Sequence, residues 1–146
     1  MNRVEPALAT GSWLAPSWEH ATVRDVMSAP VIVCPAETPL TTVARTMATR
    51  HVHAVVVTDD DADPVAWRVV SDHAMAAAGA AAGERTVGDV AERPRGAAEG
   101  DWPLDRAARL MAQNGVTHLV VVDSHGRPVG MLSTLDLAGV IAWGRS

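Results

Sequence analysis

The feature that most constrains this chain is an internal repeat, in which one half of the sequence matches the other at a constant separation. Thr22 corresponds to Thr86, a separation of 64 residues (86 − 22). The same separation aligns further pairs without a gap, namely Pro30 with Pro94, Leu40 with Leu104, Met47 with Met111 and Val57 with Val121. A repeat of this length without an insertion predicts that one folding unit is written twice.

Each copy shows the same order of predicted elements, taken from hydrophobic spacing, β-branched runs and turn residues. In the first copy we expect a short helix at 23–27, a strand at 31–34, a helix at 39–50, strands at 54–57 and 65–70, and a helix at 72–82. In the second copy these elements fall at 87–91, 95–98, 103–113, 118–122, 129–132 and 134–143. The predicted fold class is α+β, with a β-α-β-β-α unit present twice. An irregular arm is expected at 1–20, followed by copies at 21–82 and 83–146.

The composition limits the classes of partner. The formal net charge of −5, from 12 basic and 17 acidic residues, argues against a general binder of nucleic acid or anionic membranes. No apolar run is long enough to cross a bilayer, and residues 1–20 do not look like a signal peptide. The single cysteine, Cys34, cannot form an internal disulfide and suits a reducing compartment. We therefore expect a cytoplasmic protein that binds neither nucleic acid nor membrane.

The stretch 128–137 carries the clearest candidate for ligand chemistry, because a short apolar strand runs directly into a helix. Ser133 is placed to cap that helix, and Asp136 follows three residues later. A helix N-terminus attracts phosphate, and a carboxylate one turn into the helix can bind a ribose diol. The same Ser-x-x-Asp spacing also makes a capping box, in which both side chains bond to the backbone of the first turn. The spacing alone leaves both interpretations open.

Four motifs, in this order, resemble the CBS domain (the cystathionine β-synthase motif) present twice as a CBS pair, or Bateman module. They are Val-Arg-Asp-Val-Met at 23–27, Ala-Val-Val-Val at 54–57, His-Leu-Val-Val-Val-Asp at 118–123 and Gly-Met-Leu-Ser-Thr-Leu-Asp-Leu at 130–137. The resemblance covers about residues 22–143. It implies two repeats packed with pseudo-two-fold symmetry, clefts between them, and a homodimer of two such pairs.

The resemblance also implies a regulatory, ligand-binding module rather than an enzyme. CBS pairs commonly bind adenosine compounds, so we expect AMP, ADP, ATP or S-adenosylmethionine in the cleft between the repeats. The family motif places Ser133 on phosphate and Asp136 on ribose, while the adenine is expected near residues 94–98 and 116–118. The residues expected at the ligand are Gly130, Ser133, Thr134, Asp136, Val116 and His118.

The first copy departs from this motif. We align Ser71 with Ser133, which allows two extra residues in the preceding turn, and Ala74 then stands where the second copy has its aspartate. In this alignment Arg68 replaces the motif glycine and adds bulk near the cleft. Ser71 and Asp72 therefore make only a weaker site, and we expect one working cleft, built on the second copy.

Other candidate sites are less favourable. His51 and His53 with Cys34 do not reach the ligand number of a zinc site, so no metal is expected. The acidic turn 59–63 lacks the glycine and closing glutamate of a calcium loop and is interpreted as a solvated turn. No nucleophile with a base and an orienting group is visible, so we expect no catalysis. The alternative to a nucleotide sensor is a dimerising interaction scaffold without nucleotide. In both cases the sequence does not identify the regulated protein.

Overall fold

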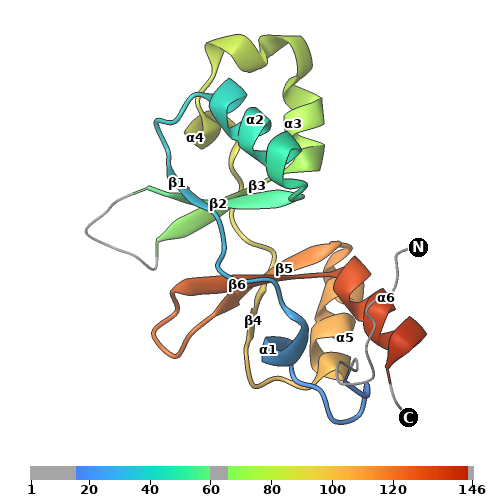
Figure 1. Cartoon of the computed structure of the whole chain (residues 1–146). Helices are drawn as coiled ribbons and strands as arrows, with labels where there is room; N and C mark the ends of the chain where they lie inside the picture. Colours follow the sequence, from blue (N-terminus) through green and yellow to red (C-terminus); the bar gives the residue numbers. More distant parts are fainter. Residues whose placement is uncertain (1–15, 60–65, 145–146) are drawn as a thin grey trace.

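The computed structural model describes residues 16–59 and 66–144, and it contains two sheets that face one another across the middle of the molecule (Figure 1). Each sheet has three strands, and helices cover the outer side of each. Residues 1–15 of the expected arm and residues 60–63 of the acidic turn lie outside the described residues. We call the upper sheet with its helices the first unit and the lower one the second unit.

The first unit is built around the buried strand β2, which lies between the other two strands of its sheet. The three strands are β1 (Val33–Pro35), β2 (Ala54–Thr58) and β3 (Trp67–Ser71). β1 is parallel to β2, and β3 is antiparallel to it. Helices α2 (Leu40–Arg50) and α3 (Asp72–Ala78) cover the sheet, and a 3₁₀ helix, η1 (Gly79–Glu84), follows. Leu40, Val55 and Val70 are fully buried in the core.

The second unit repeats this arrangement. Its strands are β4 (Ala97–Glu99), β5 (His118–Val122) and β6 (Pro128–Ser133), with β4 parallel and β6 antiparallel to β5. Helices α5 (Leu104–Asn114) and α6 (Thr134–Trp143) cover the sheet. The buried residues of α5 recur at helical spacing, at Leu104, Ala107 and Met111. That spacing is the reason why this stretch folds as a helix with one face in the core.

The short first helix of each copy packs on the sheet of the other copy. Helix α1 (Val23–Val26) places the fully buried Val23 in the second core, and α4 (Val87–Val90) places Val87 in the first core. The backbone N–H of Val23 donates to the Trp102 carbonyl oxygen (2.9 Å), and that of Val87 donates to Thr38 (2.8 Å). Each packed unit therefore contains the first helix of the other copy, so the packed units do not coincide with the two sequence repeats.

Two crossing segments, residues 29–32 and 93–96, connect the units after these exchanged helices. Isolated β-bridges flank the crossings and join Ser28 to Met131 and Glu92 to Val69. The indole Nε1–H of Trp67 in β3 also donates to the carbonyl oxygen of Gly126 in the β5–β6 turn (3.2 Å). These two bridges join equivalent positions of the two units, in agreement with the pseudo-two-fold symmetry that the family resemblance implies.

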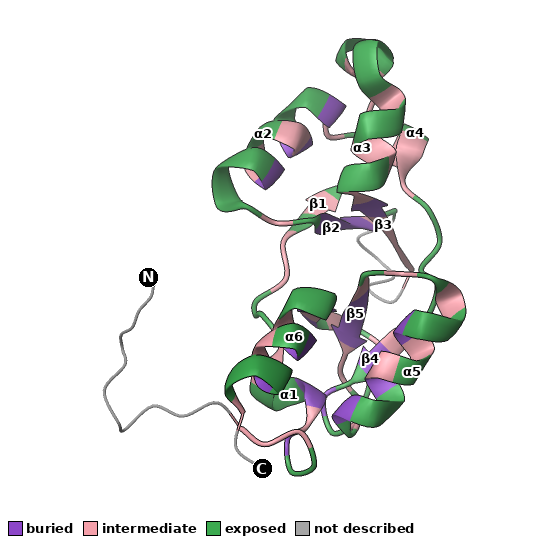
Figure 2. Cartoon of the chain, turned by 90° about the vertical axis from the view of Figure 1, so that its right-hand side faces the viewer, coloured by how far each residue is buried: buried purple, intermediate pink, exposed green. Residues whose placement is uncertain are grey.

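The α+β fold and its element order confirm the sequence prediction, and every strand begins and ends within two residues of its expected position. The last helix of the first copy differs. It is predicted at 72–82, but the α-helix stops at Ala78 because Gly79 adopts a φ of 50°. No residue of α3 is fully buried (Figure 2), although Ala74, Met75 and Ala78 are partly buried against the first core.

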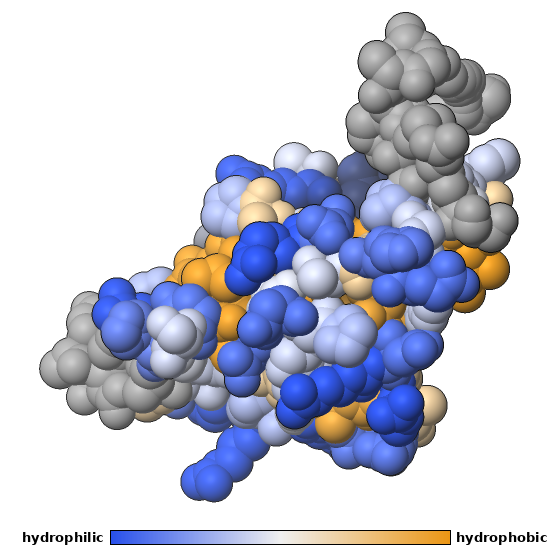
Figure 3. Space-filling view, turned by 90° about the horizontal axis from the view of Figure 1, so that it is seen from below, coloured by the Kyte–Doolittle hydropathy of each residue, from blue (hydrophilic) through white to orange (hydrophobic). Residues whose placement is uncertain are grey.

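The surface of the second unit, seen from below in Figure 3, is mainly hydrophilic with separate hydrophobic areas. Helix α6 exposes three large apolar side chains, Leu135, Ile141 and Trp143, each at least 70% accessible. Within the described ranges, no helix has the length and apolar character needed to span a membrane.

Candidate functional site

A cleft of about 750 Å³ lies between the two units and is lined by both. The first unit contributes His53, Val69, Ser71, Asp72 and His73. The second unit contributes residues 115–118, Val120 and residues 133–135 at the start of α6. Residues 92–96, which include the second crossing segment, form another wall. A molecule in this cleft would contact both copies of the repeat and the chain that connects them.

The structure brings most of the predicted site residues to this one cleft. Those that line it are Val116, His118, Ser133 and Thr134 from the second copy and Ser71 and Asp72 from the first copy. The residues assigned from the sequence to a main site and to a weaker site therefore face a common cavity. Gly130 and Asp136 do not line the cleft.

Ser71 and Ser133 hold equivalent places, as the alignment with two extra residues predicts. Ser71 caps α3 by accepting a hydrogen bond from the Ala74 N–H (3.1 Å), and Ser133 caps α6 in the same way. In the sheets, Ser71 pairs with Ala54, and Ser133 pairs with His118. The histidine of the second copy therefore stands where the first copy has a buried alanine.

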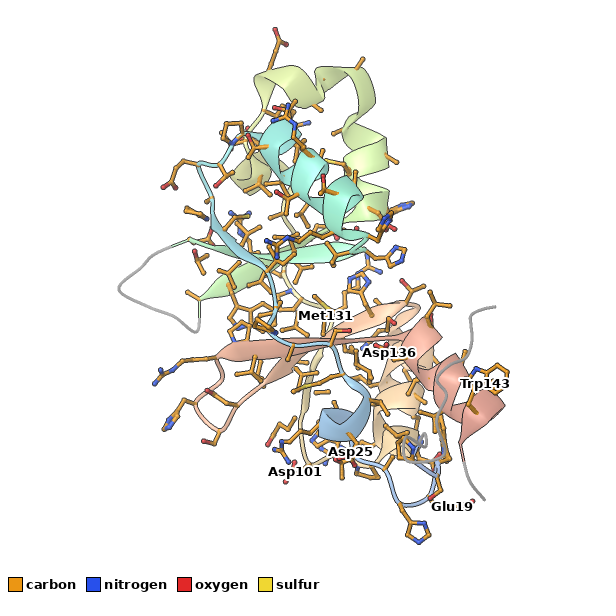
Figure 4. The ribbon with its side chains drawn as sticks, in the orientation of Figure 1. Glu19, Asp25, Asp101, Met131, Asp136 and Trp143 are labelled. Atoms are coloured by element: carbon orange, nitrogen blue, oxygen red, sulfur yellow. The ribbon has the colours of Figure 1, made fainter. Side chains whose placement is uncertain are left out.

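The Ser133 and Asp136 side chains form the capping box that their spacing allows. The Ser133 N–H donates to Asp136 Oδ2 (2.8 Å), and the Asp136 N–H donates to Ser133 Oγ (3.1 Å). Figure 4 shows Asp136 at the beginning of α6. The Thr134 N–H donates to the Thr117 carbonyl oxygen (2.9 Å). The donors at this helix start are thus largely engaged within the protein, and the contact of Asp136 with a ribose stays a prediction.

Gly130 owes its place to packing within the second unit. A Cβ atom there would lie 2.6 Å from Met27 Sδ and 3.0 Å from the Ser28 carbonyl oxygen, so a larger residue would push against the segment bridged to β6. The glycine of the motif therefore allows Met27 and Ser28, just before the first crossing segment, to approach β6 closely.

Arg68, which replaces that glycine in the first copy, does not line the cleft as we expected. Its Nε donates to both carboxylate oxygens of Asp59 (3.1 and 3.0 Å), and its Nη1 donates to the carbonyl oxygens of Gly88 and Ala91 (both 3.1 Å). The hydrogen bonds from Arg68 lower the pKa of Asp59. Arg68 therefore ties the exchanged helix α4 to β3, and its bulk lies outside the cavity.

Imidazole and carboxylate groups meet at one end of the cleft. The Nδ1–H of His53 donates to Asp72 Oδ2 (2.8 Å), and this hydrogen bond lowers the pKa of Asp72. His118 is more enclosed, and its burial lowers the pKa of the imidazole, while the charge of Asp72 raises it. At neutral pH the ligand-free cleft therefore contains a neutral His118 beside an ionised Asp72.

The sequence did not indicate that Arg93, His53 and His73 line the cleft, and Arg95 was expected only as part of the stretch beside the adenine and not as a basic group. The segment expected beside the adenine, 94–98, is only partly in place, because Pro94 lines the cleft whereas Ala98 is fully buried in the second core. Arg93 and Arg95 lie just after the exchanged helix α4, in the segment that crosses between the units. Their position in the sequence indicates a place at the cleft only once that crossing is known.

The histidines and the cysteine considered for zinc are placed separately. His51 ends α2, His53 binds Asp72, and the Cys34 thiol lies 3.8 Å from the Val56 carbonyl oxygen, where burial raises its pKa. Among residues 16–59 and 66–144, no group of three or more His, Cys, Asp or Glu side chains is arranged to hold a metal ion.

The fold and the shared cleft define a tandem-repeat module with a ligand-sized cavity between its repeats. The family model for the CBS domain matches residues 23–66 and 87–142, which are the two copies of the repeat. The matches cover more than half of the chain, so the chain belongs to the CBS domain family and contains a CBS pair. CBS pairs are generally regulatory, non-catalytic modules.

Solved structures with this fold include CBS pairs in complex with adenosine compounds. The CBS domain pair of protein MJ0100, in complex with 5′-methylthioadenosine and S-adenosyl-L-methionine, has a TM-score of 0.73 and 21% identity over 84% of this chain and 96% of that one. PAE2072 from Pyrobaculum aerophilum, complexed with AMP, has a TM-score of 0.73 and 24% identity, covering 83% and 95%. CBSX2 from Arabidopsis thaliana, in complex with AMP, has a TM-score of 0.72 and 23% identity, covering 84% and 96%. A comparison with curated proteins found no match.

Proposed function

We propose that this CBS pair is a regulatory module that binds an adenosine-containing nucleotide of the AMP, ADP or ATP class in the cleft between its units. The observation that carries the proposal is a cavity in which apolar, hydroxyl and basic side chains from both repeats meet. The complexes of structurally similar CBS pairs with AMP and with S-adenosylmethionine support this class of ligand.

The parts of a nucleotide match different walls of the cleft. Val69, Val116 and Val120 offer apolar surface to an adenine ring, and Arg93 and Arg95 offer positive charge to phosphate. As the family resemblance implies, Ser133 would lie near phosphate and Asp136 on the ribose. For that contact Asp136 must use its second carboxylate oxygen, Oδ1, or give up a capping bond.

Regulation would follow from the position of the cleft. Residues 92–96 line the cavity and also connect the units, and Glu92 is bridged to Val69 on β3. A ligand that contacts both units and this segment binds one relative arrangement of the units better than others. By linkage, it shifts the population toward that arrangement, which a regulated protein can then recognise.

The second candidate function is an interaction scaffold without nucleotide. The exposed apolar side chains towards the C-terminal end of α6, Ile141 and Trp143, favour contact with another protein surface. The one charged residue of α6, Asp136, is engaged in its cap, so the exposed face carries no charge that would repel an identical copy. A homodimer through this face is compatible with either function.

A pair of matched aspartate variants tests the nucleotide proposal. Asp136→Ala removes a capping box at the cleft, whereas Asp25→Ala removes the equivalent capping box of α1, on the far side of the second unit (Figure 4). We expect each variant to lose about 1 kcal/mol of stability in urea unfolding. Only Asp136→Ala should lose AMP binding in a calorimetric titration. If Asp136→Ala binds AMP as tightly as Asp25→Ala, Asp136 is a cap and not a ribose ligand.

A further inference from the structure

We propose that the cleft selects a phosphorylated adenine nucleotide over adenosine or S-adenosylmethionine by taking up a proton on His118 when the phosphate binds. This inference rests on the proposed function. It further specifies that the ligand carries a phosphate and that its affinity depends on pH.

His118 lies beside the expected phosphate position. His118 pairs directly with Ser133 across β5 and β6, so both side chains project from the same face of the sheet, and both line the cleft. A phosphate beside the Ser133 hydroxyl at the start of α6 would therefore lie next to the imidazole of His118.

The charged groups around His118 leave little net positive charge for a bound phosphate. The titratable and charged groups that face His118 from the surrounding elements are His53 before β2, Asp72 and His73 at the start of α3, and Glu92, Arg93 and Arg95 in the connecting wall. The formal charges of Arg93 and Arg95 are balanced by those of the two carboxylates, Asp72 and Glu92. The capping box has already engaged the Ser133 and Asp136 backbone donors. A dianionic phosphate therefore lacks a full counter-charge unless a histidine becomes protonated.

The sign of the pH dependence follows from burial. In the free protein burial lowers the pKa of His118 below its usual 6.5, so the group is neutral at pH 7. A bound phosphate raises that pKa, because an anion favours the imidazolium form. Affinity for phosphate then increases as pH falls through the raised value, and it levels off below the lowered value of the free protein.

The test is calorimetric titration of the full chain with AMP. One proton taken up changes the dissociation constant by at most about tenfold per pH unit, and we expect roughly tenfold tighter binding at about pH 6.5 than at about pH 8. Repeating the titration at about pH 7 in buffers of different ionisation enthalpy measures the proton uptake directly. Adenosine, which has no phosphate, should show no uptake, and S-adenosylmethionine should bind less tightly than AMP.

His118→Gln should abolish the proton uptake that His118 contributes and flatten the pH dependence of AMP affinity. Any dependence on pH that remains in this variant measures the protonation of AMP itself. His125→Gln is the matched control, because His125 is exposed in the β5–β6 turn and does not line the cleft. AMP binding with no proton uptake would overturn this inference and leave the proposed function intact. Full uptake in His118→Gln would overturn the assignment to His118. If neither AMP nor ADP binds at any pH, the proposed function fails and this inference fails with it.

Discussion

His51 and Gly115 end the two long helices α2 and α5 at equivalent positions, and both adopt a left-handed backbone, with φ values of 56° and 62°. Glycine adopts this conformation without steric cost, whereas a residue with a Cβ atom is disfavoured by about 1 kcal/mol. His51 is exposed and lies outside the wall of the cleft. We therefore expect His51→Gly to raise the free energy of unfolding by about 0.5 kcal/mol, measured by urea denaturation.

Gly115→Ala is the reciprocal control, because it introduces the same steric conflict at the end of α5. This variant should lower the free energy of unfolding by about 1 kcal/mol. Effects of the same sign in the two variants would show that side-chain contacts, and not the backbone conformation, determine stability at these positions.

The elements differ in how firmly the core holds them. Helix α3 buries no residue, whereas its counterpart α6 buries Leu137 and Val140. Amides in a helix that has no fully buried residue open by local fluctuations that cost less than global unfolding. We expect the backbone amides of α3 to exchange with deuterium faster than those of α6, measured by mass spectrometry of peptides from the native protein. Equal protection of the two helices would contradict this difference.

The elements could largely be predicted from the sequence, because their signals are local. Apolar residues at helical spacing marked α5, and β-branched runs marked β2 and β5. The α-helix predicted at 72–82 was too long, because Gly79 adopts a φ of 50° and the chain continues as the 3₁₀ helix η1. The Ser-x-x-Asp spacing predicted a cap on α6, and that cap is present. Spacing alone could not say whether the carboxylate also meets a ligand.

At the scale of the whole molecule, each unit depends on a helix from the other copy. Val23 and Val87 are fully buried in the cores of the second and first units. Val23→Ala and Val87→Ala should each lower the free energy of unfolding by about 2 kcal/mol. Val23→Ala should also speed amide exchange in α5 and β5, and Val87→Ala in α2 and β2. The opposite regional pattern would contradict the exchange of α1 and α4.

The exchange of α1 and α4 between the two cores could not be predicted from the sequence. A one-turn helix with a single buried valine has the same sequence pattern in whichever core it packs. The crossing segments bring Arg93 and Arg95 to the cleft, and the packing of the units places His53 and His73 opposite the second copy. The roles of these four residues could therefore not be predicted from local patterns. The cleft residues that could be predicted lie on or beside the strand-to-helix motif of each copy, namely Ser133, Thr134, Val116 and His118 in the second copy and Ser71 and Asp72 in the first.

The stoichiometry of nucleotide binding tests the central claim of a shared cleft most directly. The measurement is a calorimetric titration of the full chain with AMP, ADP and ATP in turn. Because Ser71 and Asp72 line the same cavity as Ser133 and Thr134, we expect saturation by at least one of these nucleotides at one molecule per chain. Binding of two molecules per chain would contradict the single shared cleft. The absence of binding by all three would contradict the nucleotide function and favour the interaction scaffold.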